Sequence, residues 1–327
     1  MKRNIWALGS VLLIAVVVVL SVRSVDPEKS VEKDYYQKFK KDYRIYSPII
    51  PTDIDFAGET VPVNIFYVYE KLEREILVNT YWHSNTLLMF KRARRWFPVI
   101  EPILKKNNIP DDFKYLALVE SGLMNITSPA GAKGFWQLMK TTGSEYGLEV
   151  NRQIDERYHV EKATEAACQY LNDAHKIFGD WTLVAASYNM GMGGVRKQVK
   201  RQKAESYYGL SLNSETSRYV YRILALKTIF EHPQAYGFYL REHDLYPELE
   251  YRTILVDTTI SDLADFSKQY EISYKMLKQL NPWMLTYYLP NESHKKYEIK
   301  IPEKSMMDYM KVKDSLSKKI GIFGDLK

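Results

Sequence analysis

Residues 116–137 read LALVESGLMNITSPAGAKGFWQ, and this stretch decides the fold. It opens with the residue spacing of a helix that has one apolar face. Gly122 follows at a position where glycine commonly ends a helix, so we expect Glu120 at the C-terminal end of that helix. The same pattern continues through residues 109–235 and predicts consecutive helices joined by glycine-rich turns. The sequence therefore predicts a mainly α fold.

The start of this helix is marked by Pro110, which is followed by Asp111 and Asp112. Proline is tolerated in the first turn of a helix, and an aspartate side chain can accept hydrogen bonds from the free N–H groups there. We expect one of the two aspartates to cap the helix.

The expected position of Glu120 favours a neutral carboxyl group. The C-terminal end of a helix carries partial negative charge, which disfavours a carboxylate. Nearby apolar residues in the sequence, Leu123, Phe135 and Trp136, would add desolvation. A glycosidase general acid needs such a group, because it must hold its proton near neutral pH. A Glu at a helix end is by itself more often an exposed charge, so the surrounding sequence has to decide.

Four short blocks follow one another along the chain. They are the Glu120–Ser121 pair, a Gly-x-x-Gln block from Gly134 to Gln137, an aromatic-Asn block at Tyr188–Asn189, and a Glu-Thr-x-x-Tyr-Val block from Glu215 to Val220. In this order the blocks resemble the catalytic domain of family 1 lytic transglycosylases, which are related to goose-type lysozyme. Any one block alone would be a weak signal, whereas the four together are specific.

The resemblance implies a lysozyme-like helical domain with a groove for a glycan strand, and Glu120 as its catalytic carboxyl group. It also implies roles for the residues around the groove. These are Ser121 supporting the structure beside Glu120, Ser128 and Gln137 contacting substrate near the cleavage site, Tyr188 and Asn189 lining the groove, and Tyr219 hydrogen-bonding close to Glu120. Plain core packing is the alternative for the two tyrosines.

The number of carboxyl groups decides the reaction. Ordinary glycosidases use two. Acting alone, Glu120 would protonate the oxygen between N-acetylmuramic acid and N-acetylglucosamine, then accept the proton of the same sugar's 6-hydroxyl, giving a 1,6-anhydro end without water. The alternative that the protein is a hydrolytic muramidase stays open, because Asp155, Asp180 or Glu215 could supply a second carboxylate. A non-catalytic peptidoglycan-binding scaffold is the third possibility.

The N-terminal residues 1–23 resemble an export segment. Lys2 and Arg3 precede an apolar run from Ile5 to Val22, about long enough to cross a bilayer as a helix. The cationic flank predicts that the rest of the chain is exported. We favour a membrane anchor over a cleaved signal peptide, with the catalytic domain in the periplasm.

The remaining chain divides into predicted segments: 24–60 as a tether, 61–108 as a helical N-terminal extension in which Pro98 should kink or break a helix, and 109–245 as the catalytic domain. Residues 250–303 alternate as strand, helix, helix, strand, and resemble a degenerate LysM module, a small sugar-binding α+β unit. Val256 replaces the usual glycine before its Asp257–Thr258 pair. Residues 304–327 form a C-terminal tail, expected to be a helix with a loose end.

Composition argues against several other functions. The net charge is +6, but no nucleic-acid-reading motif accompanies it, so nucleic acid is not an expected partner. The basic run Lys91, Arg92, Arg94 and Arg95 is expected to be a solvated helix face. Cys168 is the single cysteine and is expected to be a small buried hydrophobic residue. The six histidines lack ligand spacing, so we expect neither a metal nor another cofactor.

Overall fold

The computed structural model describes residue 37 and residues 45–317. The predicted membrane anchor or signal segment, residues 1–23, lies outside the described residues, as does most of the predicted tether. The chain divides into two units after residue 47, and the fold below is that of the unit that begins at Pro48. Within the described ranges, no helix has both the length and the apolar character needed to span a membrane.

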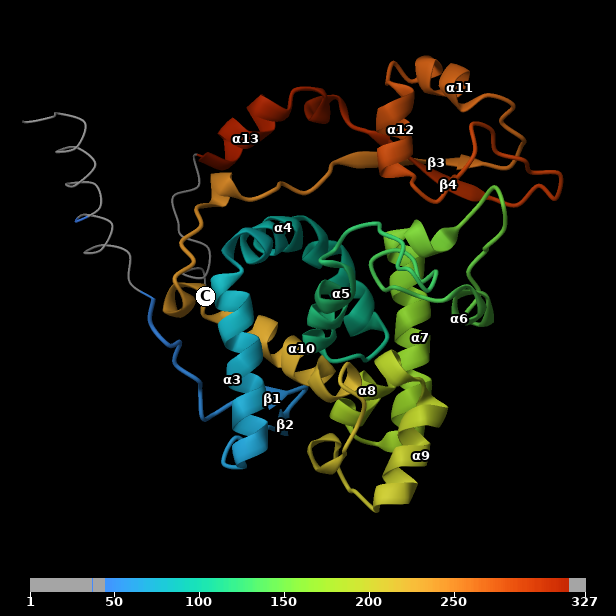
Figure 1. Ribbon diagram of the computed structural model, residues 1–327. Coiled ribbons are helices and arrows are strands. Elements are labelled where there is room, and N and C mark those ends of the chain that lie inside the picture. The colour runs from blue at the N-terminus through green and yellow to red at the C-terminus, as the bar shows by residue number, and fades with distance from the viewer. Residues whose placement is uncertain (1–36, 38–44, 318–327) are drawn as a thin grey trace, which may run out of the picture. The chain divides into compact units, whose positions relative to one another are not determined.

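Helices dominate the larger part of this unit (Figure 1). They are α3 (Phe66–Tyr81), α4 (His83–Lys106), α5 (Lys114–Ser121), α6 (Lys140–Glu145), α7 (Val160–Phe178), α8 (Trp181–Met190), α9 (Met192–Gln202) and α10 (Thr216–Glu231). All of them except the short α6 contribute side chains to one hydrophobic core, which also holds Cys168, fully buried as expected. The predicted mainly α fold is confirmed.

The central helix is α10, which packs against α3, α5 and α8. Most of its residues are buried on all sides, including Tyr219 and Val220. Even polar residues of this helix are buried, among them Lys227, which pairs with Asp112. This arrangement brings the N-terminal half of α10 beside the end of α5, where Glu120 lies.

Helix α4 contains two prolines, Pro98 and Pro102, and runs unbroken from His83 to Lys106. The prediction that Pro98 could break the helix is wrong. Each proline removes one backbone hydrogen bond. The missing donor of Pro102 would have paired with the carbonyl of Pro98, one turn earlier. The packing of α4 against α5 and α7 keeps the helix continuous.

The basic run on α4 is not a solvated face, contrary to expectation. It fastens the segment 241–248 to the helix. Lys91 bonds the Asp244 carbonyl, Arg94 pairs with Glu242 and Glu248, Arg95 bonds the Pro247 carbonyl, and Lys91 and Arg95 both lie over the Tyr246 ring. These partners lie far along the chain, so local spacing could not reveal them.

The end of the predicted tether is part of the folded unit. Strands β1 (Asp55–Phe56) and β2 (Glu59–Thr60) form a short antiparallel hairpin. Phe56 is fully buried, and its ring centroid lies 5.2 Å from that of Phe113. The Glu59 carboxylate accepts hydrogen bonds from the backbone N–H groups of Trp181 and Thr182 at the start of α8. These contacts attach the hairpin to the helical domain.

The C-terminal module is a β-α-α-β unit, as predicted. Strands β3 (Tyr251–Val256) and β4 (Tyr297–Pro302) pair antiparallel, and α11 (Leu263–Gln269) and α12 (Tyr274–Leu280) connect them. The helices begin where Asp262 and Ser273 accept hydrogen bonds from backbone N–H groups of the first turn. Figure 1 shows both helices on one side of the strand pair. In the predicted tail, α13 (Tyr309–Ser317) follows, and residues 318–327 lie outside the described ranges.

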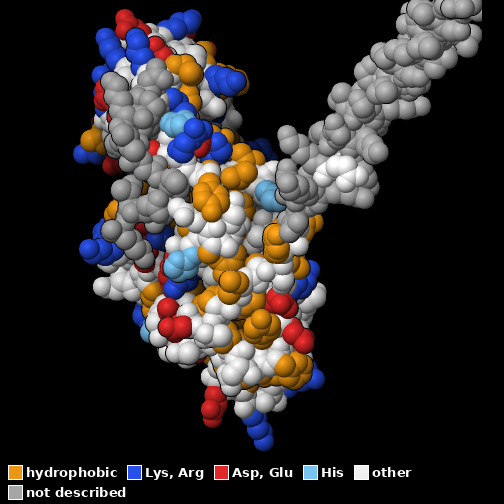
Figure 2. Space-filling model, turned by 90° about the vertical axis from the view of Figure 1, so that its left-hand side faces the viewer, with side chains coloured by type: hydrophobic (Ala, Val, Ile, Leu, Met, Phe, Trp, Pro, Cys, Tyr) orange, Lys and Arg blue, Asp and Glu red, His pale blue; other side chains and the backbone are white. Residues whose placement is uncertain are grey.

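The side of the molecule on which α3 lies is seen in Figure 2. Hydrophobic side chains are scattered over it between Lys, Arg, Asp and Glu. Helix α3 and its C-cap contribute exposed apolar residues: Phe66, Tyr67, Leu77, Val78 and Trp82. Exposed apolar side chains interspersed with charges are normal for folded proteins.

Candidate active site

Glu120 lies in the last turn of α5, as the sequence predicted. The helix ends at Gly122, whose φ is 59° and whose N–H donates to the Leu118 carbonyl at 2.8 Å. The Arg92 guanidinium donates through Nε to the Gly122 carbonyl at 2.5 Å. A Cβ on Gly122 would stand only 3.1 Å from that guanidinium. Glycine is therefore required here both by backbone conformation and by the approach of Arg92.

The predicted aspartate cap of this helix is wrong. A 3₁₀ turn, Asp111–Phe113, precedes α5, and no side chain caps either element. Asp112 accepts a hydrogen bond from the Ala57 N–H at 2.7 Å and pairs with Lys227 at 3.0 Å. Asp112 therefore bonds residues far along the chain and does not cap α5.

The Glu120 carboxyl group holds its proton to a higher pH than an ordinary glutamate does. Burial is the largest cause and raises its pKa to about 7. The hydrogen bond from Tyr219 and the charge of Arg222 lower the pKa, whereas the charge of Glu215 raises it. The side chain is nonetheless partly exposed, so a group in solvent can reach it. The apolar residues expected to desolvate it are all buried: Leu123, Phe135 and Trp136.

Tyr219 lies on the buried face of α10 and donates its hydroxyl proton to Oε1 of Glu120 in a short hydrogen bond. The sequence predicted this proximity from resemblance alone. Arg222 was missed, although a signal was present. Glu215, Tyr219 and Arg222 stand at i, i+4 and i+7, which is one face of a helix. Through this face, Tyr219 and Arg222 lower the pKa of Glu120 and Glu215 raises it.

Ser121 is buried and does not face solvent. Its hydroxyl donates to the Phe135 carbonyl at 2.8 Å and accepts from the Met124 N–H at 3.4 Å. It thereby ties the end of α5 to the loop after it, which matches the supporting role that the resemblance implied. A direct contact between this hydroxyl and substrate does not fit its burial.

The loop from Gly122 to Leu138, called the catalytic loop below, carries Ser128 and Gln137. The Ser128 hydroxyl accepts from the Ala132 N–H at 3.0 Å and holds a tight turn. The Gln137 side-chain amide donates to the Gly134 carbonyl at 2.7 Å, and within the described part of the chain nothing donates to its carbonyl oxygen. Both side chains are partly exposed, and Gln137 has an oxygen left for a ligand.

The backbone of the catalytic loop is strained at both ends. Leu123 and Gln137 have φ values of 57° and 46°, in the left-handed region that non-glycine residues rarely adopt. Gly134 has φ 77°, and a Cβ there would lie 1.9 Å from the Arg157 carbonyl oxygen. Strain of this kind persists only where surrounding contacts enforce it, and it is common at functional sites.

Tyr188 and Asn189 are on the last turn of α8. The Tyr188 hydroxyl donates to the Trp136 carbonyl at 2.7 Å, so this tyrosine supports the catalytic loop. Burial and, after it, the nearby charge of Glu120 raise the pKa of Tyr188. The Asn189 amide oxygen accepts from the Thr216 hydroxyl at 2.7 Å. Both side chains are partly exposed. The structure thus gathers all seven predicted site residues around one helix end and one loop.

Of the three other carboxylates that could have joined Glu120, two are committed elsewhere. Asp155 is buried and paired with Arg157 at 2.8 Å. Asp180 accepts from the Leu183 N–H at 2.6 Å and caps α8. Glu215 is exposed, with Oε1 3.5 Å from the amide nitrogen of Asn189. Among the described residues, no cluster of His, Cys, Asp or Glu is arranged to hold a metal ion.

Comparison with known proteins identifies two domains in the chain. The family model described as Transglycosylase SLT domain matches residues 97–210, and that described as Soluble lytic transglycosylase C-terminal LysM-like domain matches residues 252–305. Membrane-bound lytic murein transglycosylase D of Escherichia coli is 36% identical over 183 residues, which make up 54% of this chain and 40% of that protein. The chain thus spans less than half the length of this relative.

Two solved structures are also similar. The crystal structure of the 70 kDa soluble lytic transglycosylase of Escherichia coli is 21% identical with a TM-score of 0.38, covering 42% of this chain and 24% of that one. An inactive mutant of the lytic transglycosylase Slt from Pseudomonas aeruginosa is 22% identical with a TM-score of 0.36, covering 43% of this chain and 24% of that one. From its sequence matches, this chain carries a transglycosylase SLT domain followed by a LysM-like domain of the soluble lytic transglycosylase type.

Proposed function

We propose that this protein is a peptidoglycan lytic transglycosylase. It cuts the β-1,4 bond between N-acetylmuramic acid and N-acetylglucosamine and leaves a 1,6-anhydro end, in cell-wall remodelling and turnover. The observation that carries the proposal is Glu120 within an SLT domain: a reachable carboxyl group with a pKa of about 7 that accepts a hydrogen bond from Tyr219. A group with this pKa can both give and take a proton near neutral pH.

In the first step Glu120 acts as a general acid. Because Tyr219 donates to Oε1, the acidic proton is best carried on Oε2. Glu120 gives this proton to the glycosidic oxygen, the bond to the anomeric carbon breaks, and an oxocarbenium-like state forms. The carboxylate that remains is stabilised by the Tyr219 hydroxyl and the positive charge of Arg222.

In the second step the same carboxylate acts as a base. It accepts the proton of the 6-hydroxyl on the cleaved muramic acid residue, and that oxygen bonds to the anomeric carbon. Glu120 is then protonated again, so the cycle closes without a water molecule. Gln137, Ser128 and Asn189 are proposed to contact the sugars on either side of the bond, with Asn189 at the N-acetyl group.

The mass of the products separates this reaction from its alternatives. Digestion of purified peptidoglycan should release muropeptides that are lighter by one water than hydrolysis products. Reducing ends would instead indicate a hydrolytic muramidase, with exposed Glu215 as the candidate second carboxylate. Glu215→Gln should still give anhydro products. Glu120→Gln should abolish digestion. If the wild-type protein digests nothing, the chain is a peptidoglycan-binding scaffold.

We further propose that residues 109–245 form the catalytic domain behind a helical extension at 61–108, and that the module at 250–303 binds glycan. The apolar run in residues 1–23 is proposed to anchor the protein in the membrane, with the catalytic domain in the periplasm. Support comes from the run itself and from the related protein named as membrane-bound. Cell fractionation tests this, because an anchored protein stays in the membrane pellet after an alkaline carbonate wash.

A further inference from the structure

Arg157 is a buried cation that donates hydrogen bonds to the backbone of the catalytic loop. It lies in the 3₁₀ turn before α7 and is 4% exposed. Its Nη1 donates to the carbonyl oxygens of Gly131 and Leu138, both at 3.1 Å. Its Nε and Nη2 donate to the two carboxylate oxygens of Asp155, both at 2.8 Å. One planar guanidinium thus joins two points of the loop to a fixed acid, which a lysine could not do.

The two carbonyls that Arg157 holds lie beside the proposed substrate contacts. Gly131 belongs to the turn closed by Ser128, and Leu138 follows Gln137 directly. The Leu138 carbonyl also accepts the Lys133 N–H at 3.1 Å. Arg157 therefore fixes the loop at the places where its strained shape must be enforced.

The acid that orients Arg157 is itself held by the LysM-like module. The Asp155 N–H donates to the Trp283 carbonyl at 2.9 Å, and the Leu285 N–H donates to the Gln153 carbonyl at 2.7 Å. Between these bonds, Ile154 is 1% exposed and belongs to the hydrophobic core of the module. Residues 153–155 of the catalytic domain thus pair with residues 283–285 of the module through an isolated antiparallel bridge at Ile154 and Met284.

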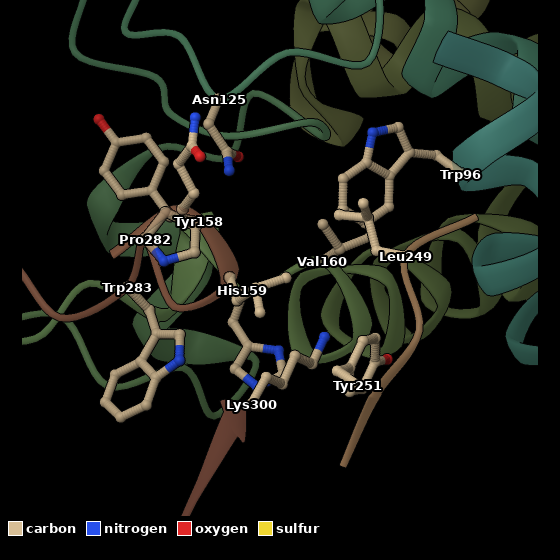
Figure 3. Close-up of a pocket in the computed structure, with 12 residues that line it drawn as sticks. Trp96, Asn125, Tyr158, His159, Val160, Leu249, Tyr251, Pro282, Trp283 and Lys300 are labelled. Atoms are coloured by element: carbon tan, nitrogen blue, oxygen red, sulfur yellow. The ribbon is translucent and has the colours of Figure 1, made fainter. Parts of the chain in front are cut away.

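The contact between domain and module is close. Figure 3 shows the pocket that remains there, to whose lining the catalytic domain contributes Tyr158, His159 and Val160 and the module contributes Trp283 and Lys300. Its volume of about 40 Å³ has room for a few water molecules but not for a sugar ring. Glu161 pairs with Lys300 at 2.5 Å and accepts from the Tyr251 hydroxyl at 3.0 Å beside it.

We infer that Arg157 is a positioning residue, which holds the catalytic loop in the shape needed to bind glycan and makes the LysM-like module part of that support through Asp155. The inference rests on the proposed function of the loop. It separates Arg157 from the proton transfers, because the groups that act on Glu120 come from α5 and α10. Arg157 should therefore affect substrate binding more than the pH dependence of catalysis.

Kinetics of the full-length protein on soluble glycan strands test this role. Arg157→Lys keeps the charge but cannot bond Asp155 and both loop carbonyls at the same time. KM should therefore rise roughly threefold to tenfold, the effect of about one hydrogen bond. The change in kcat should be smaller, and the pH midpoint should not move. Arg94→Lys is the matched control, since Arg94 pairs with two acids away from the loop. Equal KM values in wild type and Arg157→Lys would overturn the inference.

A second measurement does not depend on activity. Hydrogen exchange should be faster in Arg157→Lys by roughly tenfold at the loop amides of Gly131, Lys133 and Gly134, which are hydrogen-bonded within the loop. Ile154→Ala, which loosens the module contact, should give a smaller increase at the same amides. Unchanged exchange in both variants refutes the inference even if wild type digests nothing. Inactive wild type with faster exchange in the variants refutes only the proposed enzyme activity.

Discussion

The hydrogen bond from Tyr219 to Glu120 makes a sharp prediction for Tyr219→Phe. The substitution removes one buried hydroxyl and leaves the ring that packs in α10. The hydroxyl donates to the charged form of Glu120 more strongly than to the neutral form, so it lowers the pKa of that carboxyl group. Its loss should therefore raise the pKa above the wild-type value.

The size of the effect follows from the type of bond. A hydrogen bond to a charged group contributes about 1.5–3 kcal/mol, and about 1.4 kcal/mol changes a pKa by one. From a wild-type pKa of about 7, Tyr219→Phe should raise the pKa of Glu120 to about 8–9. At pH 8 about a tenth of wild-type Glu120 carries the acidic proton, against at least about half in the variant. At pH 6 the variant should be slower, because a weaker acid donates less readily.

The assay is the pH dependence of kcat/KM for release of anhydro products. Activity needs protonated Glu120, so the rate should fall as pH rises through its pKa, and this fall should move to higher pH in Tyr219→Phe. Tyr208→Phe is the control, since the Tyr208 hydroxyl is buried and has no hydrogen-bond partner among the described residues. A midpoint that stays in place, or moves to lower pH, would refute the reasoning.

Three further predictions concern stability, measured as the free energy of unfolding in urea. The folded state raises the pKa of Glu120 from 4.5 to about 7, so it keeps a proton that the unfolded chain releases between those pH values, and stability falls across this window by up to about 3 kcal/mol. Glu120→Gln should therefore match wild type near pH 4 and exceed it at pH 8; a constant difference would contradict this. Gly134→Ala should cost more than about 3 kcal/mol, because its Cβ meets the Arg157 carbonyl, whereas Gly58→Ala, with similar φ but open space, should cost about 1–2 kcal/mol. The partners His159 and Lys300 help to hold the pKa of Glu161 well below its usual range, so Glu161→Gln should lose about 1–3 kcal/mol at pH 7. The loss should shrink as pH falls below the unfolded value of 4.5, because the unfolded wild-type chain then gains a proton that the folded protein does not; an equal loss at pH 3 would exclude the ion pair as the cause.

Much of the local structure was predictable from local sequence. Gly122 marked the end of α5, and therefore the place of Glu120, because few other residues adopt its backbone conformation easily. The alternation of Tyr251 to Val256 predicted β3 to its bounds, since Ile254 and Val256 on one face are partly buried and Leu255 between them is exposed. The order of the four blocks predicted the SLT domain, which sequence comparison then identified.

Predictions failed where tertiary contacts, most of them with residues far along the chain, outweighed the local preference. Asp112 was expected to cap a helix, but it bonds Ala57 and Lys227 instead. The basic run on α4 was expected to face solvent, but it holds the segment 241–248, which a charge pattern on one helix cannot reveal. A break of α4 at Pro98, one of the two outcomes expected there, does not occur, because packing outweighed the lost hydrogen bond.

The candidate site residues could be named from the sequence, because the residue types, their order and the helix end at Gly122 are local properties. How the proton affinity of Glu120 is adjusted depends instead on the packing of distant segments. The pKa of Glu120 depends on burial by several helices, and on Tyr219 and Arg222, which α10 brings to it from about a hundred positions away. The support of the catalytic loop by Arg157 likewise depends on a module that begins far along the chain. Desolvation and hydrogen bonding act through space, so their partners are set by packing rather than by spacing along the sequence.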